Sequence, residues 1–215
     1  ISNYYKNSAL AIGNFDGVHI GHQKVFSETK KFSKKRKIKF GVLTFTPLPV
    51  MFFEKKIKNF RLSSEPEKIK LLMKYKVDFV INIKFNKNFS KISAKDFIKK
   101  IIYKKIKPQS LSVSNNFRFG RKRKGDVNLL KKFSRNYGYK LLKINPRKHL
   151  SKIVSSTRIR NSLKNGNIKL ANKLLSRTWF IDGKVINISA RISSELLMYN
   201  KPVGEECSHT SSRRT

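Results

Sequence analysis

The 215-residue sequence contains a single cysteine, Cys207, and only 12 acidic residues. One cysteine excludes an internal disulfide framework and a cysteine-rich metal site, which fits a reducing compartment, so we expect a cytoplasmic protein. No uninterrupted apolar run approaches the length of a membrane-spanning helix, and no secretory signal is visible, so we expect no membrane partner. The shortage of acids leaves a formal net charge of +38.

This positive charge has two interpretations. Clustered Lys and Arg side chains neutralise phosphates and would indicate a nucleic-acid partner. Here the lysines are spread through every segment beside abundant Ile, Asn and Phe, which is typical of a codon bias toward A and T. We favour the compositional explanation and expect no nucleic-acid partner, with a non-catalytic basic RNA-binding protein as an alternative. On either interpretation, a positive surface attracts anionic small molecules.

The order of apolar segments predicts an α/β fold. The apolar fraction of 39% is sufficient for one packed domain. Strand-like and helix-like segments alternate, which indicates a Rossmann-like, doubly wound, five-stranded parallel sheet followed by a helical segment. We expect a domain over residues 1–178 and an irregular tail over 179–215 with no domain of its own. The expected strands are 9–12, 38–44, 78–83, 110–113 and 140–144, with a possible strand at 180–186; the expected helices are 21–37, one from 64, 93–105, 127–136, 154–166 and 168–175.

The helix from residue 64 has a recognisable start. Ser64 precedes Pro66 in the first turn and Glu67 three residues later, which is the pattern of a capping box. The spacing of its apolar residues predicts a buried face formed by Ile69, Leu72 and Met73.

The stretch from Gly13 to His22 concentrates glycine, acid and histidine in a lysine-rich chain. His19 and His22 are two of only four histidines, and they flank Gly21 where the first strand meets the first helix. A helix start offers free backbone N–H groups and a positive dipole end, and imidazole N–H groups add donors, so this stretch could bind phosphate and support nucleotidyl transfer. Alternatively, the histidines cap a helix or bind a metal. We expect no protein-bound metal, because neither His149 nor His209 completes a zinc-like set.

Three motifs in order carry a resemblance to a known family. Residues 13–22 resemble the motif of the HxGH nucleotidyltransferase superfamily. Asn115-Asn116-Phe117-Arg118-Phe119-Gly120 with Gly125-Asp126, and then Ser155-Ser156-Thr157-Arg158-Ile159-Arg160, narrow this resemblance. Together they resemble the FAD synthetase module of bacterial bifunctional riboflavin kinase/FAD synthetases, over roughly residues 8–186. Another HxGH enzyme, such as a cytidylyltransferase or a pantetheine-phosphate adenylyltransferase, is the alternative that the Phe-Arg-Phe-Gly loop argues against.

The resemblance implies transfer of AMP from ATP to FMN, giving FAD and pyrophosphate, with Mg²⁺ assisting. It implies that His19, His22 and Arg160 are catalytic, and that Ser156, Thr157 and Arg160 close on the β and γ phosphates. The implied ATP-binding residues are Gly13, Phe15, Asp16, Gly17, His19, Gly21, His22, Ser156, Thr157 and Arg160; the implied flavin-binding residues are Asn116, Phe117, Phe119 and Asp126.

Each of the later motifs also has a simpler explanation. Residues 155–160 alone would indicate a capped surface helix, and residues 115–126 an ordinary loop anchored by aromatic side chains. The cluster Arg121-Lys122-Arg123-Lys124 could bind nucleic acid, but we favour a basic loop over an anionic substrate.

The chain also departs from the family pattern. Thr46-Pro47-Leu48-Pro49 stands where the family usually has a segment like Asp-Pro-His-Pro, and Ser114 replaces a usual glycine. Residues 181–185 resemble the opening of a riboflavin kinase module, but no Pro-Thr-Ala-Asn-like segment follows, so riboflavin kinase activity is not expected. Residues 196–208 resemble a short segment of ribosomal RNA pseudouridine synthases, and we assign them no activity.

Overall fold

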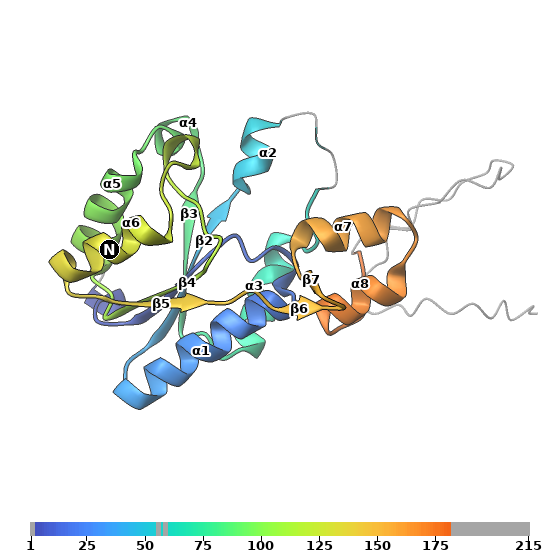
Figure 1. Cartoon of the computed structure of the whole chain (residues 1–215), viewed down its shortest axis with the longest axis horizontal. Helices are drawn as coiled ribbons and strands as arrows, with labels where there is room; N and C mark the ends of the chain where they lie inside the picture. The colour runs from blue at the N-terminus through green and yellow to red at the C-terminus, as the bar shows by residue number, and fades with distance from the viewer. Residues whose placement is uncertain (1–2, 55–56, 58–59, 182–215) are drawn as a thin grey trace, which may run out of the picture. The chain divides into compact units, whose positions relative to one another are not determined.

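A computed structural model describes residues 3–54, 57 and 60–181 (Figure 1). The possible strand at 180–186 lies mostly outside these residues, as do Cys207, His209 and the segment 196–208. The described residues up to Arg177 belong to one compact unit. The predicted division of the chain at residue 178 stays a prediction.

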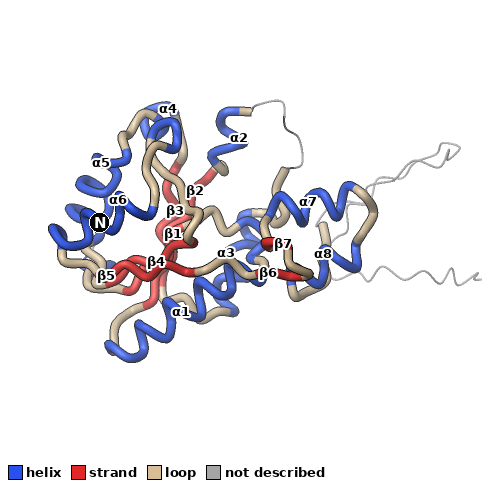
Figure 2. Tube along the Cα trace, in the orientation of Figure 1, coloured by secondary structure: helices blue, strands red, loops and turns tan. Residues whose placement is uncertain are grey.

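Five parallel strands form the centre of this unit (Figure 2). Their order across the sheet is β3-β2-β1-β4-β5, so the chain winds first to one side of β1 and then to the other. The Rossmann-like, doubly wound five-stranded sheet is therefore confirmed. The strands are β1(Ala9–Ile12), β2(Phe40–Thr46), β3(Phe79–Lys84), β4(Ser110–Ser114) and β5(Lys140–Ile144).

Helices cover both faces of the sheet (Figure 1). On one face, Ala11 of β1 packs in a core with residues of α1(Ile20–Arg36) and α3(Glu65–Lys74). On the other, Leu10 and Ile12 pack in a second core with α5(Ala94–Asp96), η3(Phe97–Ile106), which is a π-helix, and α6(Val127–Tyr137). Neighbouring residues of β1 face opposite cores because side chains alternate along a strand. Two short helices, α7(Ser156–Lys164) and α8(Ile168–Leu175), follow the sheet as expected.

The sequence pattern did not predict several short elements. Helix α2(Pro49–Phe53) follows β2, with Pro49 in its first turn, where a missing N–H costs nothing. Helix α4(Lys87–Ser90) starts at an Asn86 cap, and β6(Lys148–His149) pairs with β7(Lys152–Ile153) as a small hairpin. Elements this short have too few residues to show a periodicity.

The start of α3 agrees with the sequence, but its buried face does not. The Ser64 hydroxyl accepts a hydrogen bond from the Glu67 N–H at 3.2 Å, as the capping pattern predicts. Leu72 is fully buried, whereas Met73 is 67% exposed, so the predicted face is partly wrong. The helix instead buries Lys68 one turn before Leu72, and a pattern of apolar residues cannot reveal a buried lysine.

No helix among the described residues is long and apolar enough to cross a membrane.

Candidate functional site

A cavity of about 980 Å³ opens where the parallel strands end. Residues that directly follow β1 and β3 line it, together with the last residue of β4 and with Pro146, which lies two residues beyond β5. Ligands bind at this edge of doubly wound sheets because the loops diverge on either side of the central strand. We call two groups of lining residues the polar wall (Gly13, His19, Gly21, His22, Ser155 and Ser156) and the aromatic wall (Phe45, Phe53, Phe85, Phe89, Phe117 and Phe119).

His19 sits at the N-cap of α1. Its Nδ1 accepts hydrogen bonds from the backbone N–H groups of Gly21 and His22, at 3.2 and 3.3 Å. The expectation that these N–H groups are free for an anion is therefore wrong, because the imidazole already satisfies them. Since Nδ1 accepts, the neutral ring carries its proton on Nε2, and that N–H is the donor left to offer a ligand.

His19 and His22 form a stacked pair. Their ring centroids lie 3.6 Å apart with an interplanar angle of 18°. Burial lowers the pKa of His19 to about 4, and burial together with the neighbouring His19 lowers the pKa of His22. Both rings are therefore neutral near pH 7, which avoids repulsion between them. The buried Nδ1 of His22 has no hydrogen-bond partner among the described residues, so this ring keeps an unsatisfied polar atom inside the protein while the residue lines the cavity.

Glycines let the backbone pass close to these rings. A Cβ at Gly21 would lie 3.0 Å from Cε1 of His19, and a Cβ at Gly13 would lie 2.9 Å from the Phe15 ring. Gly17 has a φ of +75° and packs against Leu62, so a side chain there would be both strained and crowded.

Asp16 and Arg160 lie outside the lining of the cavity and bind each other. The Arg160 Nη2 donates to the Asp16 carboxylate at 2.6 Å, and its Nε donates to the Phe60 carbonyl at 2.7 Å. Burial raises the pKa of Asp16, and the Arg160 guanidinium opposes this. This ion pair connects the third motif to the first, and the Arg160 guanidinium is already bound to Asp16 and Phe60. Its predicted contact with phosphates stays a prediction.

The start of α7 combines capping with exposure to the cavity. The Ser155 hydroxyl accepts from the Arg158 N–H at 3.2 Å and caps the helix. Ser156 lines the cavity and donates to the Asp16 carbonyl at 3.0 Å. Thr157 is exposed and does not line the cavity. Residues 155–160 therefore do begin a capped helix, and both Ser155 and Ser156 also line the cavity.

The loop after β4 places its predicted residues unevenly. Asn116, Phe117 and Phe119 line the cavity, and the two phenylalanine rings stack with centroids 5.5 Å apart. Asp126 does not line it, and its carboxylate caps α6 by accepting from the Leu129 N–H at 2.9 Å. A role for Asp126 in flavin binding stays a prediction.

Sequence reasoning missed most of the aromatic wall. The Phe85 ring contacts the rings of Phe45, Phe53 and Phe89, with centroids 5.6 to 6.4 Å apart. These residues come from separate segments, so only the fold brings them together. Residues 46–49, which depart from the family pattern, lie next to this wall. Leu48 is buried and directly precedes α2, whose Phe53 lines the cavity.

Two further features bear on charged ligands. Arg121, Lys122 and Arg123 line the cavity, which supports the interpretation of this loop as a cover over an anionic substrate. Among residues 3–54, 57 and 60–181, no three His, Cys, Asp or Glu side chains gather closely enough to hold a metal ion.

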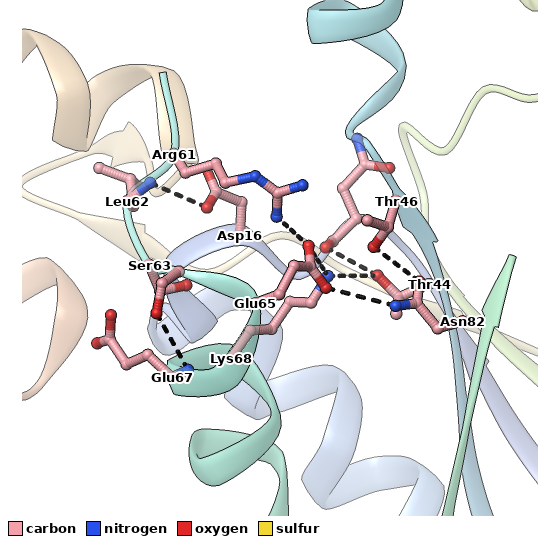
Figure 3. A network of polar contacts seen from close by, with 12 residues as sticks. Asp16, Thr44, Thr46, Arg61, Leu62, Ser63, Glu65, Glu67, Lys68 and Asn82 are labelled. Carbon is pink, nitrogen blue, oxygen red and sulfur yellow. Dashed lines mark hydrogen bonds and ion pairs between the residues drawn. The ribbon is translucent and has the colours of Figure 1, made fainter. Parts of the chain in front are cut away.

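A polar network lies behind the first motif (Figure 3). Leu62 donates its N–H to the Asp16 carboxylate at 2.9 Å, and the Gly17 N–H donates to the Ser63 hydroxyl at 3.2 Å. Next to these contacts, the buried Lys68 ammonium pairs with Glu65 at 3.0 Å. The segment from residue 60 to 68 therefore supports the loop from which the site histidines start.

Comparison with known proteins gives a consistent result. The family model described as FAD synthetase matches residues 1–158. A bifunctional riboflavin kinase/FMN adenylyltransferase of Buchnera aphidicola from Acyrthosiphon pisum is 42% identical over 181 residues, which cover 84% of this chain and 58% of that protein. The protein of the same name from Escherichia coli is 33% identical over 178 residues, covering 83% and 57%. The chain thus spans little more than half the length of these relatives.

A solved structure supports the fold alone. The crystal structure described as a macrolide-efflux protein from Streptococcus pneumoniae superposes with a TM-score of 0.70 at 24% identity, over 80% of this chain and 56% of that one.

Proposed function

The chain belongs to the FAD synthetase family, and from this premise we propose that it is an FMN adenylyltransferase, which transfers AMP from ATP to FMN and releases pyrophosphate. The observation that carries the proposal is the pairing of two unlike walls in one cavity. Neutral imidazoles at a helix start suit a polyphosphate, and a ring of phenylalanines suits a flat aromatic acceptor.

The proposed reaction needs positioning more than proton transfer. An oxygen of the FMN phosphate attacks the α-phosphorus of ATP, a new P–O bond forms, and the bond from that phosphorus to the bridging oxygen breaks. The electron pair leaves with pyrophosphate. Because the attacking phosphate is largely ionised at neutral pH, no general base is required. Catalysis then depends on alignment and on stabilising the charge that spreads over the phosphoryl oxygens.

In this scheme the polar wall binds ATP. His19 offers its Nε2–H to a phosphate oxygen, and its ring is held in that orientation by the two N–H groups it caps. His22 stacks on this ring and lines the same cavity. Donors that are fixed before the substrate binds stabilise developing charge without reorganisation. The hydroxyl of Ser156 lies on the same wall.

The aromatic wall binds FMN, with Phe117 and Phe119 offering ring faces and Asn116 a polar group. The basic loop Arg121–Arg123 attracts the acceptor phosphate. Mg²⁺ bound to the phosphates of ATP would supply charge neutralisation there. Arg160 would have to leave Asp16 to reach the β and γ phosphates, and we assign it first to holding the motifs together.

Product formation tests the proposal. The purified protein is incubated with ATP, Mg²⁺ and one acceptor at a time, namely FMN, riboflavin or phosphopantetheine, and products are separated by chromatography. We expect FAD and pyrophosphate in equal amounts with FMN and no adenylated product with the other acceptors. A folded protein that adenylates phosphopantetheine, or none of the three, contradicts the proposal.

A further inference from the structure

Lys68 is buried in a position where a lysine is costly. Only 1% of the residue is exposed, because it lies on the inner face of α3, which also carries the fully buried Leu72. Burial lowers the pKa of its ammonium, and the carboxylate of Glu65 opposes this. A buried ion pair contributes little to stability compared with apolar side chains of similar size. The contacts of this ammonium therefore matter more than its contribution to the core.

The ammonium connects α3 to the first motif. Its Nζ donates to Oε1 of Glu65 at 3.0 Å and to Oγ1 of Thr44 at 3.4 Å. The Thr44 hydroxyl donates in turn to the carbonyl of Asn14 at 3.0 Å. Since Thr44 is fully buried in β2, this relay reaches the loop that follows β1 from inside the protein. The Asn14 carbonyl lies five residues before His19.

Glu65 is itself held in place. Its Oε1 also binds Arg61, and its Oε2 accepts from Asn82 at 3.4 Å (Figure 3). Burial acts to raise the pKa of Glu65, but hydrogen bonds from Arg61 and Lys68 outweigh it and keep that pKa below its usual value. The carboxylate thus stays charged and keeps the Lys68 ammonium in one orientation.

We propose that Lys68 is a positioning residue for the reaction, because its ammonium orients Thr44 and thereby fixes the Asn14 carbonyl ahead of the site histidines. This inference rests on the proposed function. Nearby contacts from Leu62 and Ser63 hold Asp16 and Gly17. The loop is therefore fixed at three of its residues, at positions 14, 16 and 17. A misplacement of about 1 Å in such a loop can cost on the order of a hundredfold in rate.

Four variants separate positioning from folding. Lys68→Met removes the ammonium and keeps most of the volume. Lys68→Met with Glu65→Gln also removes the charge of the carboxylate, which would otherwise keep Arg61 as its remaining partner of the two cations. Thr44→Val removes only the hydroxyl of the relay. Lys70→Met is the matched control, because Lys70 lies on the exposed side of the same helix.

We expect Lys68→Met to lower kcat roughly tenfold to a hundredfold, with KM for FMN changed less than about threefold. Adding Glu65→Gln restores part of the Tm but not kcat, because it removes a partly buried carboxylate that has lost one of its two cationic partners and does not rebuild the relay. Thr44→Val gives a similar loss of kcat, and combining it with Lys68→Met adds little, since both changes break the same chain of contacts. Lys70→Met leaves kcat unchanged. If kcat recovers together with Tm in the Glu65→Gln combination, Lys68 is only structural and the inference is wrong.

Amide hydrogen exchange provides a readout that does not depend on activity. We expect the peptide covering residues 13–19 to exchange faster in Lys68→Met and Thr44→Val, and at the wild-type rate in Lys70→Met. Unchanged exchange in Lys68→Met and Thr44→Val would overturn the inference even if the wild-type protein makes FAD. If the wild-type protein makes no FAD but the exchange differs as expected, the proposed function fails and the positioning of the loop by Lys68 stands.

Discussion

The two walls of the cavity are built by different kinds of interaction. On the polar wall, His19 and Ser156 are each held by hydrogen bonds to the backbone, and the network behind them fixes the loop that carries Asp16. On the aromatic wall, the side chains of Phe85 and its neighbours pack ring against ring. Directional bonds fix atoms to fractions of an ångström, whereas ring packing tolerates exchange of similar side chains. Substitutions on the polar wall should therefore change the rate, and substitutions on the aromatic wall should change affinity.

The largest expected effect is the loss of His19. His19→Ala removes the Nε2–H donor and also the cap of α1. We expect kcat for FAD formation to fall about 10² to 10³-fold, as for other donors that stabilise phosphoryl or oxyanion charge. Steady-state kinetics at saturating ATP and FMN measures this.

His19→Asn is the matched variant. An asparagine side chain can cap the helix, so we expect the Tm to return close to the wild-type value while kcat stays as low as in His19→Ala. If His19→Asn recovers most of the rate, His19 acts as a helix cap only, and the contrast between the walls loses its strongest support.

The pH dependence of stability is the next effect. Because burial lowers the pKa of His19 to about 4 from its usual 6.5, the unfolded chain binds a proton between these values that the folded protein does not. The stabilisation that comes from a neutral His19 is therefore complete above pH 6.5 and is lost as the pH falls toward 4. At pH 4, we expect protonation of His19 in the unfolded chain to have lowered the free energy of unfolding by about 3 kcal/mol. Urea unfolding from pH 7 to 4 should show this loss in the wild type and a smaller one in His19→Asn; parallel curves would contradict it.

A smaller change is expected on the aromatic wall. Phe85→Leu removes a ring that contacts Phe52, Phe53 and Phe89 but leaves an apolar side chain. We expect KM for FMN to rise about tenfold, with kcat and KM for ATP within about twofold of the wild type. Phe32→Leu on α1, outside the cavity lining, is the control. A fall in kcat without a change in KM for FMN would remove the distinction between the walls.

The smallest effect is expected at the basic loop. Lys122→Gln with Arg123→Gln removes two charges beside the cavity. We expect kcat/KM for FMN to fall two- to threefold at low salt, and the difference to disappear near 0.5 M salt because the attraction is screened. Lys131→Gln with Lys132→Gln removes the same charge from α6. An equal fall of kcat/KM in the two double variants would mean that the net charge of the whole protein attracts FMN, and that the loop has no particular role.

The sequence predicted the sheet well because its strands and long helices carry strong signals. The apolar run of β1 indicates a buried strand, and Gly138 marks the end of α6 as a left-handed cap. It also pointed to most of the polar wall, since residues 13–22 are contiguous. It failed for Phe85 and Phe89, which only the fold brings to the cavity, and for Lys68, whose burial contradicts its residue type. It placed Arg160 and Asp126 in the site, whereas in the structure an ion pair and a helix cap engage them.

Transfer of labelled AMP tests the central claim most directly. With ATP labelled at the α-phosphate, excess FMN and Mg²⁺, a single turnover by the wild-type protein should place the label in FAD and release unlabelled pyrophosphate. Phe85→Leu should do so at nearly the same rate when FMN is saturating, and His19→Asn should be slower by at least about a hundredfold. If the label stays in ATP with the folded wild-type protein, or if both variants are equally slowed, the account of a rate-determining polar wall and an affinity-determining aromatic wall is wrong.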